Sequence, residues 1–197
     1  MKSRIILASA SPRRQELLTQ IGLPFEVCPS EWEEVTDKEL PEEVVQELSY
    51  HKAMEVYERN VTEEGTVVIG ADTIVACGGQ VLGKPGNRER AEEMLGKLQG
   101  GTHQVYTGVA FVWKEKGRTE TAGFYECTDV RVYPMTEEEI RCYVETGEPM
   151  DKAGAYGIQG LGALLVEGIQ GDFFNVMGLP ILRLSRMLST FGVTFFN

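Results

Sequence analysis

Short apolar runs alternate along this chain with segments of helical spacing. Residues 4–8 form a brief apolar run, which predicts a buried strand. Ser11 and Pro12 follow as a capping hydroxyl and a first-turn proline, and the apolar residues up to Ile21 are spaced as on a helix. Gly22 then supplies a stop. The N-terminus therefore predicts a strand, a tight turn and a helix.

The same patterns predict the remaining elements. Helices are expected from Pro41 to about Tyr57, over 88–99, from a Thr136–Glu139 capping box to near Gly147, and after Pro180. Strands are expected over 66–76, 80–82, 105–113 and 119–132, with a short one before a turn at 168–172.

Helices and strands thus alternate throughout, which predicts an α/β fold with a mixed sheet around a cleft rather than a bundle or a sandwich. The sequence shows no repeat, low-complexity tract or linker. A single domain over residues 1–197 is expected, with two lobes as an option that its length allows. Catalytic groups are then expected in loops at strand ends.

Composition narrows the functional classes. The formal net charge of −11 disfavours binding to DNA or RNA, although a few local cations can still hold a small anion. No apolar run is long enough to span a membrane, and no export signal is recognisable, so we expect a soluble cytoplasmic protein. The four cysteines lack zinc or redox spacing and are expected to be reduced.

The first candidate site is the turn before the first predicted helix, with Ser9, Arg13 and Arg14. Unsatisfied N–H groups and a partial positive charge at a helix start suit an anion such as phosphate. The alternative is a capped helix whose arginines are solvated. Both interpretations fit the sequence.

Asp72 is the one carboxylate within the apolar run 66–76. Burying an ionised carboxylate is costly unless a cation, a metal or hydrogen-bond donors compensate it, so Asp72 indicates a site. The alternative ends the strand at Ile69 and leaves Asp72 in a turn beside Gly70.

Two lysines are further candidates. Lys52 falls on the apolar stripe of its predicted helix, where its stem can either reach a cleft or extend to solvent. Lys84 follows a short predicted strand and can equally be a solvated loop lysine. Residues 78–84 have the spacing of a phosphate-binding P-loop, but Pro85 replaces the hydroxyl residue that should reach magnesium, so we reject that interpretation.

The segment 151–162 is dense in glycine, which lets backbone approach a ligand closely. It carries Lys152, a candidate for phosphate binding, and Gln159, whose amide can read a base edge. A flexible surface loop is the alternative. The isolated side chains His51, His103 and Trp32 are expected to be packing or surface residues.

Four motifs in order resemble the Maf family, once described as septum formation inhibitors: Ala-Ser-Ala-Ser-Pro-Arg-Arg, Gly-Ala-Asp-Thr-Ile-Val, Leu-Gly-Lys-Pro and Asp-Lys-Ala-Gly-Ala-Tyr-Gly-Ile-Gln-Gly. The resemblance covers residue 5 to the last helix. It implies an elongated, mixed and twisted sheet flanked by helices, with two lobes around a cleft, related to the inosine triphosphate pyrophosphatases. It also implies hydrolysis of nucleoside triphosphates with Mg²⁺ or Mn²⁺.

By position, the resemblance makes Asp72 the proton acceptor that activates water. It places Ser9, Arg13, Lys52 and Lys84 around the triphosphate. Glu34 would hold the metal together with Asp72, although Glu33 is an alternative at this loosely matched segment.

Arg14, Thr73 and Gln159 resemble the branch of the family that acts on dTTP and UTP rather than the one that prefers 7-methyl-GTP. The expected function is therefore hydrolysis of dTTP and UTP to the monophosphate and pyrophosphate. A nucleotide-binding regulator of cell division without turnover is the alternative. The oligomeric state is open, with a homodimer among the options.

Overall fold

The computed structural model describes residues 3–61 and 63–196, and its described strands form one seven-stranded mixed sheet. The sheet order is β2-β1-β3-β5-β6-β7, and β4 pairs with β3 off this path. The strands are β1 (Arg4–Leu7), β2 (Glu26–Val27), β3 (Thr66–Cys77), β4 (Gln80–Leu82), β5 (Thr102–Glu115), β6 (Arg118–Val132) and β7 (Val166–Gln170).

The helices are α1 (Pro12–Gln20), α2 (Pro41–Asn60), α3 (Arg88–Leu98), α4 (Glu137–Glu145), α5 (Phe173–Met177) and α6 (Ile181–Thr190). Three 3-10 turns lie between α4 and β7, namely η1 (Glu148–Asp151), η2 (Ala153–Ala155) and η3 (Gly160–Leu164). The α/β prediction is confirmed, and so are the main predicted elements to within a few residues.

The chain divides into two compact units, and β3, β5 and β6 each contribute residues to both. Unit 1 comprises residues 1–72, 107–126 and 178–197, and unit 2 comprises 73–106 and 127–177. That all 197 residues act as one domain stays a prediction.

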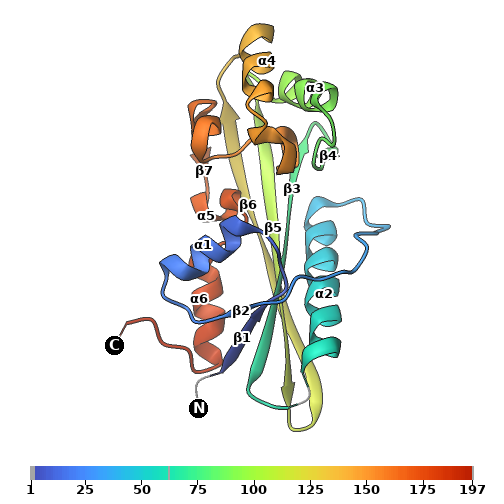
Figure 1. Cartoon of the computed structure of the whole chain (residues 1–197), viewed down its shortest axis with the longest axis vertical. Coiled ribbons are helices and arrows are strands. Elements are labelled where there is room, and N and C mark those ends of the chain that lie inside the picture. The colour runs from blue at the N-terminus through green and yellow to red at the C-terminus, as the bar shows by residue number, and fades with distance from the viewer. Residues whose placement is uncertain (1–2, 62, 197) are drawn as a thin grey trace. The chain divides into compact units, whose positions relative to one another are not determined.

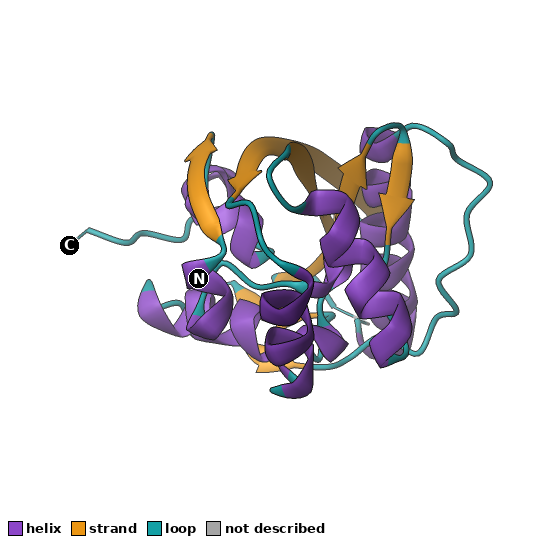
Figure 2. Ribbon diagram, turned by 90° about the horizontal axis from the view of Figure 1, so that it is seen from above, coloured by secondary structure: helices purple, strands orange, loops and turns teal. Residues whose placement is uncertain are grey.

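Unit 1 is built on parallel pairing of β1 with both β2 and β3. Alternate residues of β5 face opposite sides: Ala110 and Val112 join the apolar cluster under α2, whereas Phe111 meets Phe191 just after α6. Period-two alternation of this kind is what a strand with both faces covered requires. Figure 1 shows α2 and α6 on opposite sides of these strands, and Figure 2 shows helices bordering the strands.

The core of unit 2 lies where α3, α4 and η2 pack on β3, β5 and β6. Buried residues of α3, including Leu95 and Leu98, meet Val105 and Val130 of the sheet. The capping box predicted at Thr136 and Glu139 is present at the start of α4. Within the described chain, no helix is long and apolar enough to cross a membrane.

Two predictions about local structure were wrong. Ser11 precedes α1 but its side chain makes no capping hydrogen bond. Gly168 lies inside β7 rather than in a turn, paired with Arg131 of β6. The glycine-rich segment 151–162 includes the last residue of η1, all of η2 and the first residues of η3.

Candidate active site

Asp72 lies within β3 and is buried, with only 6% of its surface exposed. The strand continues to Cys77, so the alternative that places Asp72 in a turn after Ile69 is wrong. A carboxylate on a strand that is otherwise apolar needs a compensating cation.

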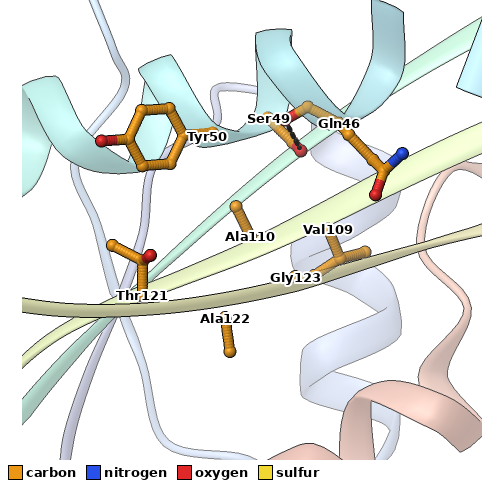
Figure 3. A pocket seen from close by; sticks show the side chains of 8 residues that line it. All are labelled: Gln46, Ser49, Tyr50, Val109, Ala110, Thr121, Ala122 and Gly123. Carbon is orange, nitrogen blue, oxygen red and sulfur yellow. Dashed lines mark hydrogen bonds between the residues drawn. The ribbon is translucent and has the colours of Figure 1, made fainter. Parts of the chain in front are cut away.

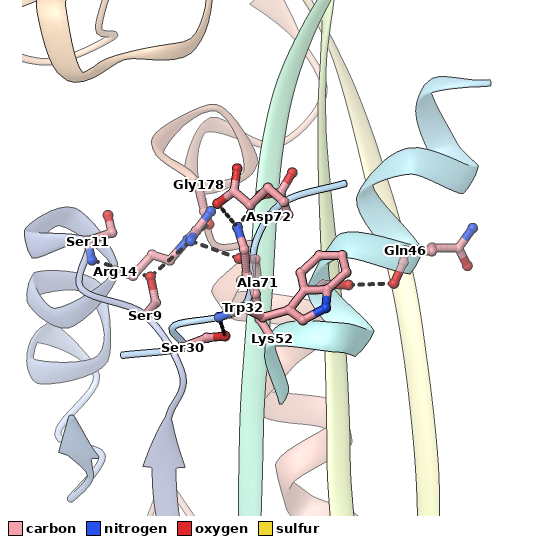
Figure 4. Close-up of polar contacts among 12 residues, drawn as sticks. Ser9, Ser11, Arg14, Ser30, Trp32, Gln46, Lys52, Ala71, Asp72 and Gly178 are labelled. Carbon is pink, nitrogen blue, oxygen red and sulfur yellow. Dashed lines mark hydrogen bonds and ion pairs between the residues drawn. The ribbon is translucent and has the colours of Figure 1, made fainter. Parts of the chain in front are cut away.

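Lys52 is that cation, and it also binds Glu34. Its Nζ lies 2.6 Å from Oδ1 of Asp72 and 2.6 Å from Oε1 of Glu34. The Lys52 side chain is 11% exposed and that of Asp72 is 9% exposed, whereas that of Glu34 is 56% exposed. One ammonium therefore joins a buried carboxylate to a half-exposed one, as Figure 4 shows for Lys52 and Asp72.

Two glycines allow α2 to approach the sheet closely enough for this contact. A Cβ at Gly70 of β3 would lie 2.1 Å from the carbonyl oxygen of Ser49, and one at Gly108 of β5 would lie 2.2 Å from that of Val45. No side chain fits at either position. Val45, Leu48 and Val56 of the predicted apolar stripe are buried, so this face of α2 packs on the sheet. Lys52 lies on the same stripe, and the close approach brings it to β3.

Arg14 is buried and is bound to oxygens of the protein. Its Nε donates to the carbonyl of Gly178 at 2.8 Å, and its Nη1 donates to Oγ of Ser9 at 3.0 Å and to the carbonyl of Ala71 at 2.9 Å (Figure 4). Burial lowers the pKa of Arg14, while Asp72 and Glu34 oppose that shift, and a guanidinium remains charged at neutral pH.

This geometry makes Arg14 a link between three segments of unit 1, including the residue before Asp72. The sequence indicated an anion site here but gave no sign that the guanidinium would hold backbone carbonyls. Ser9 is 8% exposed, and its Oγ also accepts from the N–H of Ser11 at 3.3 Å. Arg13 is half-buried as the second residue of α1.

The other predicted residues belong to unit 2. Thr73 is half-buried on β3, Lys84 is exposed between β4 and α3, and Gln159 is exposed just before η3. Lys152 donates through Nζ to the carbonyl of Glu148 at 2.6 Å and to the carboxylate of Asp151 at 2.7 Å. These bonds fix Lys152 against Gly157, where a Cβ would lie 2.9 Å from its Cε.

Glu148 organises the glycine-rich segment and was not predicted. Its carboxylate accepts from the N–H groups of Leu161 and Gly162 at 2.9 and 2.8 Å and from the hydroxyl of Tyr143 at 2.9 Å. Partial burial raises the pKa of Glu148, but these donors outweigh that effect and leave the pKa below its usual value. A carboxylate six residues before a run of glycines gives no spacing signal that sequence reasoning can use.

A pocket of about 260 Å³ opens between α2, β5 and β6, apart from these charges. Figure 3 shows the side chains that line it. They are all uncharged: Gln46, Ser49, Tyr50, Val109, Ala110, Thr121, Ala122 and Gly123. A pocket without cations is poorly suited to a triphosphate. The better candidate is the group formed by Asp72, Lys52 and Glu34, here called the charged cluster.

The described residues include no group of three or more His, Cys, Asp and Glu side chains that could hold a metal ion. Asp72 and Glu34 nevertheless contact the same nitrogen, so their oxygens lie no farther apart than twice 2.6 Å. Magnesium is commonly bound by one or two carboxylates, with water and substrate phosphates completing its shell. The pair fits that kind of site.

The fold is an open mixed sheet with helices, so the protein belongs to the α/β class. One of its units contains a buried carboxylate, a lysine bound to it, and two arginines in the first turn of α1. These cations suit an anionic ligand. The family model of Maf-like protein matches residues 4–191, and the chain belongs to the Maf family. This confirms the resemblance drawn from the four motifs.

Three relatives are named dTTP/UTP pyrophosphatase. The protein of Agathobacter rectalis is 54% identical over 97% of this chain and 98% of its own length. That of Symbiobacterium thermophilum is 52% identical over 98% and 97%, and that of Bacillus cereus strain G9842 is 50% identical over 96% of each chain.

Proposed function

We propose that this protein hydrolyses dTTP and UTP between the α and β phosphates, releasing the nucleoside monophosphate and pyrophosphate. Relatives that are about half identical over nearly their full length carry the name of this activity. The observation in the structure that carries the proposal is the buried Asp72, held at 2.6 Å from Lys52.

The proposed reaction assigns Asp72 as the proton acceptor. A water oxygen forms a bond to the α phosphorus, the bond from that phosphorus to the bridging oxygen breaks, and the water proton passes to Asp72. Lys52 and Arg13 stabilise charge on the departing pyrophosphate. Ser9, Lys84 and Lys152 are proposed as further phosphate-binding residues.

A divalent cation, Mg²⁺ or Mn²⁺, is proposed to be held by Asp72 and Glu34. It would supply charge neutralisation at the phosphate oxygens. The two carboxylates that accept from Lys52 support this proposal, because a cation already lies between them. With a metal held by the two carboxylates, the Lys52 ammonium would be available to bind phosphate.

Arg14, Thr73 and Gln159 are proposed to set the preference for pyrimidine nucleotides. The bonds of Arg14 to Ser9 and to the carbonyl of Ala71 support a role in which Arg14 fixes segments that are proposed to bind the nucleotide. A panel that includes dTTP, UTP, GTP and 7-methyl-GTP tests the branch. A clear preference for 7-methyl-GTP would contradict it.

Replacement of Asp72 by Asn is the direct test of the mechanism. We expect kcat for pyrophosphate release to fall by about 100-fold or more, because loss of a general base typically has that effect. Circular dichroism should show a retained fold. The matched control is Asp37→Asn, since the Asp37 side chain is 88% exposed. Near-normal turnover of the Asp72 variant would refute the assignment, and absence of turnover in the unchanged protein would favour a binding-only regulator.

Metal removal is the second test. Dialysis against a chelator should abolish turnover, and Mg²⁺ or Mn²⁺ should restore it, because without a metal the two carboxylates repel the negatively charged triphosphate. Glu34→Gln should raise the metal concentration needed for half-maximal activity, and Glu33→Gln should not. Full activity in excess chelator would contradict a metal role.

We also propose that the protein acts in the cytoplasm on free nucleotides. Its four cysteines are free thiols in the structure, which suits a reducing compartment. Binding partners beyond the nucleotide, a second copy of the chain among them, stay predictions.

A further inference from the structure

The segment Pro29–Thr36, here called the strap, leads from β2 towards α2 and carries Glu34. It contains no helix or strand, so no regular pattern of backbone hydrogen bonds holds it in place. The strap is nevertheless attached to α2 along most of its length. How it is attached determines where the Glu34 carboxylate lies.

The α2 residues that hold the strap recur every four positions: Glu47, His51, Glu55 and Arg59. Residues four apart lie on one face of a helix, so these four side chains form a single stripe. The strap runs along the stripe in the opposite direction, because its first residue meets Arg59 and its last meets Glu47.

The contacts at the first end of the strap are polar. Arg59 donates to the carbonyl of Pro29 at 2.9 Å and pairs with Glu31 at 3.2 Å, and the N–H of Glu31 donates to Glu55 at 3.3 Å. The side chains of Glu31 and Arg59 are 82% and 38% exposed. Ion pairs this exposed hold a segment weakly.

The middle contact is different in kind. The rings of Trp32 and His51 stack with centroids 4.5 Å apart and an angle of 17° between planes, and Tyr50 packs its edge against the same imidazole. Stacked rings add apolar burial to a defined orientation. Trp32 is two residues before Glu34, and His51 is next to Lys52, so the stack attaches the strap to α2 beside the charged cluster.

We propose that the Trp32–His51 stack is the positioning device that holds the Glu34 carboxylate at Lys52 and Asp72. The inference rests on the proposed function, in which Glu34 and Asp72 hold a divalent cation. Trp32 and His51 do not touch the reacting atoms; they act through Glu34. Without the stack, the 56%-exposed Glu34 side chain would lose the fixed backbone that brings it to Lys52.

The proposal adds a positioning role to two residues that the sequence led us to expect as packing or surface side chains. On sequence alone, Trp32 and His51 are far apart and lack partners. The helix α2 brings them together, because residue 51 lies between the positions that contact the two ends of the strap.

The test uses the whole protein and the metal alone, so that its readouts do not depend on turnover. The chain has two tryptophans, and a Trp113→Phe background leaves Trp32 as the one fluorophore of its kind. In this background, His51→Ala should shift Trp32 emission to the red, and hydrogen exchange of the strap amides should accelerate.

Binding of Mn²⁺ without nucleotide should weaken about tenfold in His51→Ala, as expected when a residue that orients a metal ligand is lost. Glu34→Gln should weaken binding to a similar extent, and adding His51→Ala to it should have little further effect. His51→Phe, which preserves a ring, should restore binding and slow exchange. Arg59→Ala, at the exposed end, should change Mn²⁺ affinity less than about twofold.

The proposal is overturned if His51→Ala leaves Mn²⁺ binding and strap exchange unchanged, or if His51→Phe fails to restore them in a folded protein. It is also overturned if His51→Ala weakens Mn²⁺ binding as strongly when Glu34 is already Gln. Failure of the proposed function has a separate signature, which is the absence of pyrophosphate release by the unaltered protein.

Discussion

Lys52 is the residue that holds the charged cluster together. It is shared by Asp72 and Glu34 at equal distances of 2.6 Å, and its side chain is almost wholly buried. A lysine in that position both neutralises the carboxylates and holds them near each other. The sequence places Lys52 on an apolar stripe, a position from which its side chain can reach either a cleft or solvent.

Removing the charge of Lys52 should therefore affect stability as well as activity. Lys52→Met leaves the buried Asp72 carboxylate without its partner, which costs on the order of 3 kcal/mol in the free energy of unfolding. Urea denaturation measures this. The double variant Lys52→Met/Asp72→Asn should regain most of that stability without regaining turnover. An unchanged unfolding midpoint in Lys52→Met would contradict the pairing.

His103 gives unit 2 a predictable response to acid. It is fully buried, its Nε2 lies 2.8 Å from the hydroxyl of Tyr156, and burial lowers its pKa to about 4, against a smaller opposing effect of Asp129. The unfolded chain binds a proton more readily than the folded one, so stability is lost as the pH falls from the unfolded pKa of about 6.5 towards 4.

Between about pH 7 and about pH 5 the contribution of His103 should fall by about 2 kcal/mol. The free energy of unfolding of the unaltered protein should show this fall, and that of His103→Asn should be flatter over the same range. Equal slopes for the two proteins would show that His103 is not buried in its neutral form.

At the scale of elements, the placement of α2 against β3 decides whether the cluster forms. Gly70 meets the backbone of Ser49 and Ala53, so Gly70→Ala should separate helix and strand and destabilise the protein by about 2 kcal/mol or more. Gly96→Ala is the matched control, because that α3 glycine has nothing within 4 Å of the added carbon and should stabilise its helix by up to about 1 kcal/mol. Thermal unfolding compares the two, and a stable Gly70→Ala would contradict the close approach.

The long elements were predictable because their patterns are local. The apolar run over residues 66–76, the capping box at Thr136 and the proline before α6 each specify an element from adjacent residues. Two elements were not predicted: the two-residue strand β2 and the five-residue helix α5 (Phe173–Met177). Both are too short to show a period in the sequence, so they depend on tertiary contacts. In α5, for example, the side chain of Asn175 donates to the carbonyl of Val105.

The candidate site was predictable only in part. A lone carboxylate in an apolar strand identified Asp72, and the motifs identified the residues named with it. The partners that fix these residues come from distant segments: Gly178 and Ala71 for Arg14, and the α2 stripe for the strap. Such contacts leave no spacing in the sequence.

At the scale of the whole molecule, the predicted site residues divide between the two units at the peptide bond after Asp72. Unit 1 contains the two carboxylates, Lys52 and the two arginines, and unit 2 contains Thr73, Lys84, Lys152 and Gln159. The variant Lys84→Met removes a positive charge that is proposed to bind phosphate. It should raise KM for the triphosphate more than it lowers kcat, and steady-state kinetics measures both. An unchanged KM would show that Lys84 is not part of the site.

The central claim is that water attacks the α phosphorus with Asp72 accepting the proton. The most direct measurement is hydrolysis of dTTP or UTP by the metal-loaded protein in isotopically labelled water, followed by phosphorus NMR and mass spectrometry of the products. The account predicts a nucleoside monophosphate that carries the heavy oxygen, together with unlabelled pyrophosphate. Label in the pyrophosphate, or formation of a diphosphate and free phosphate, would contradict it.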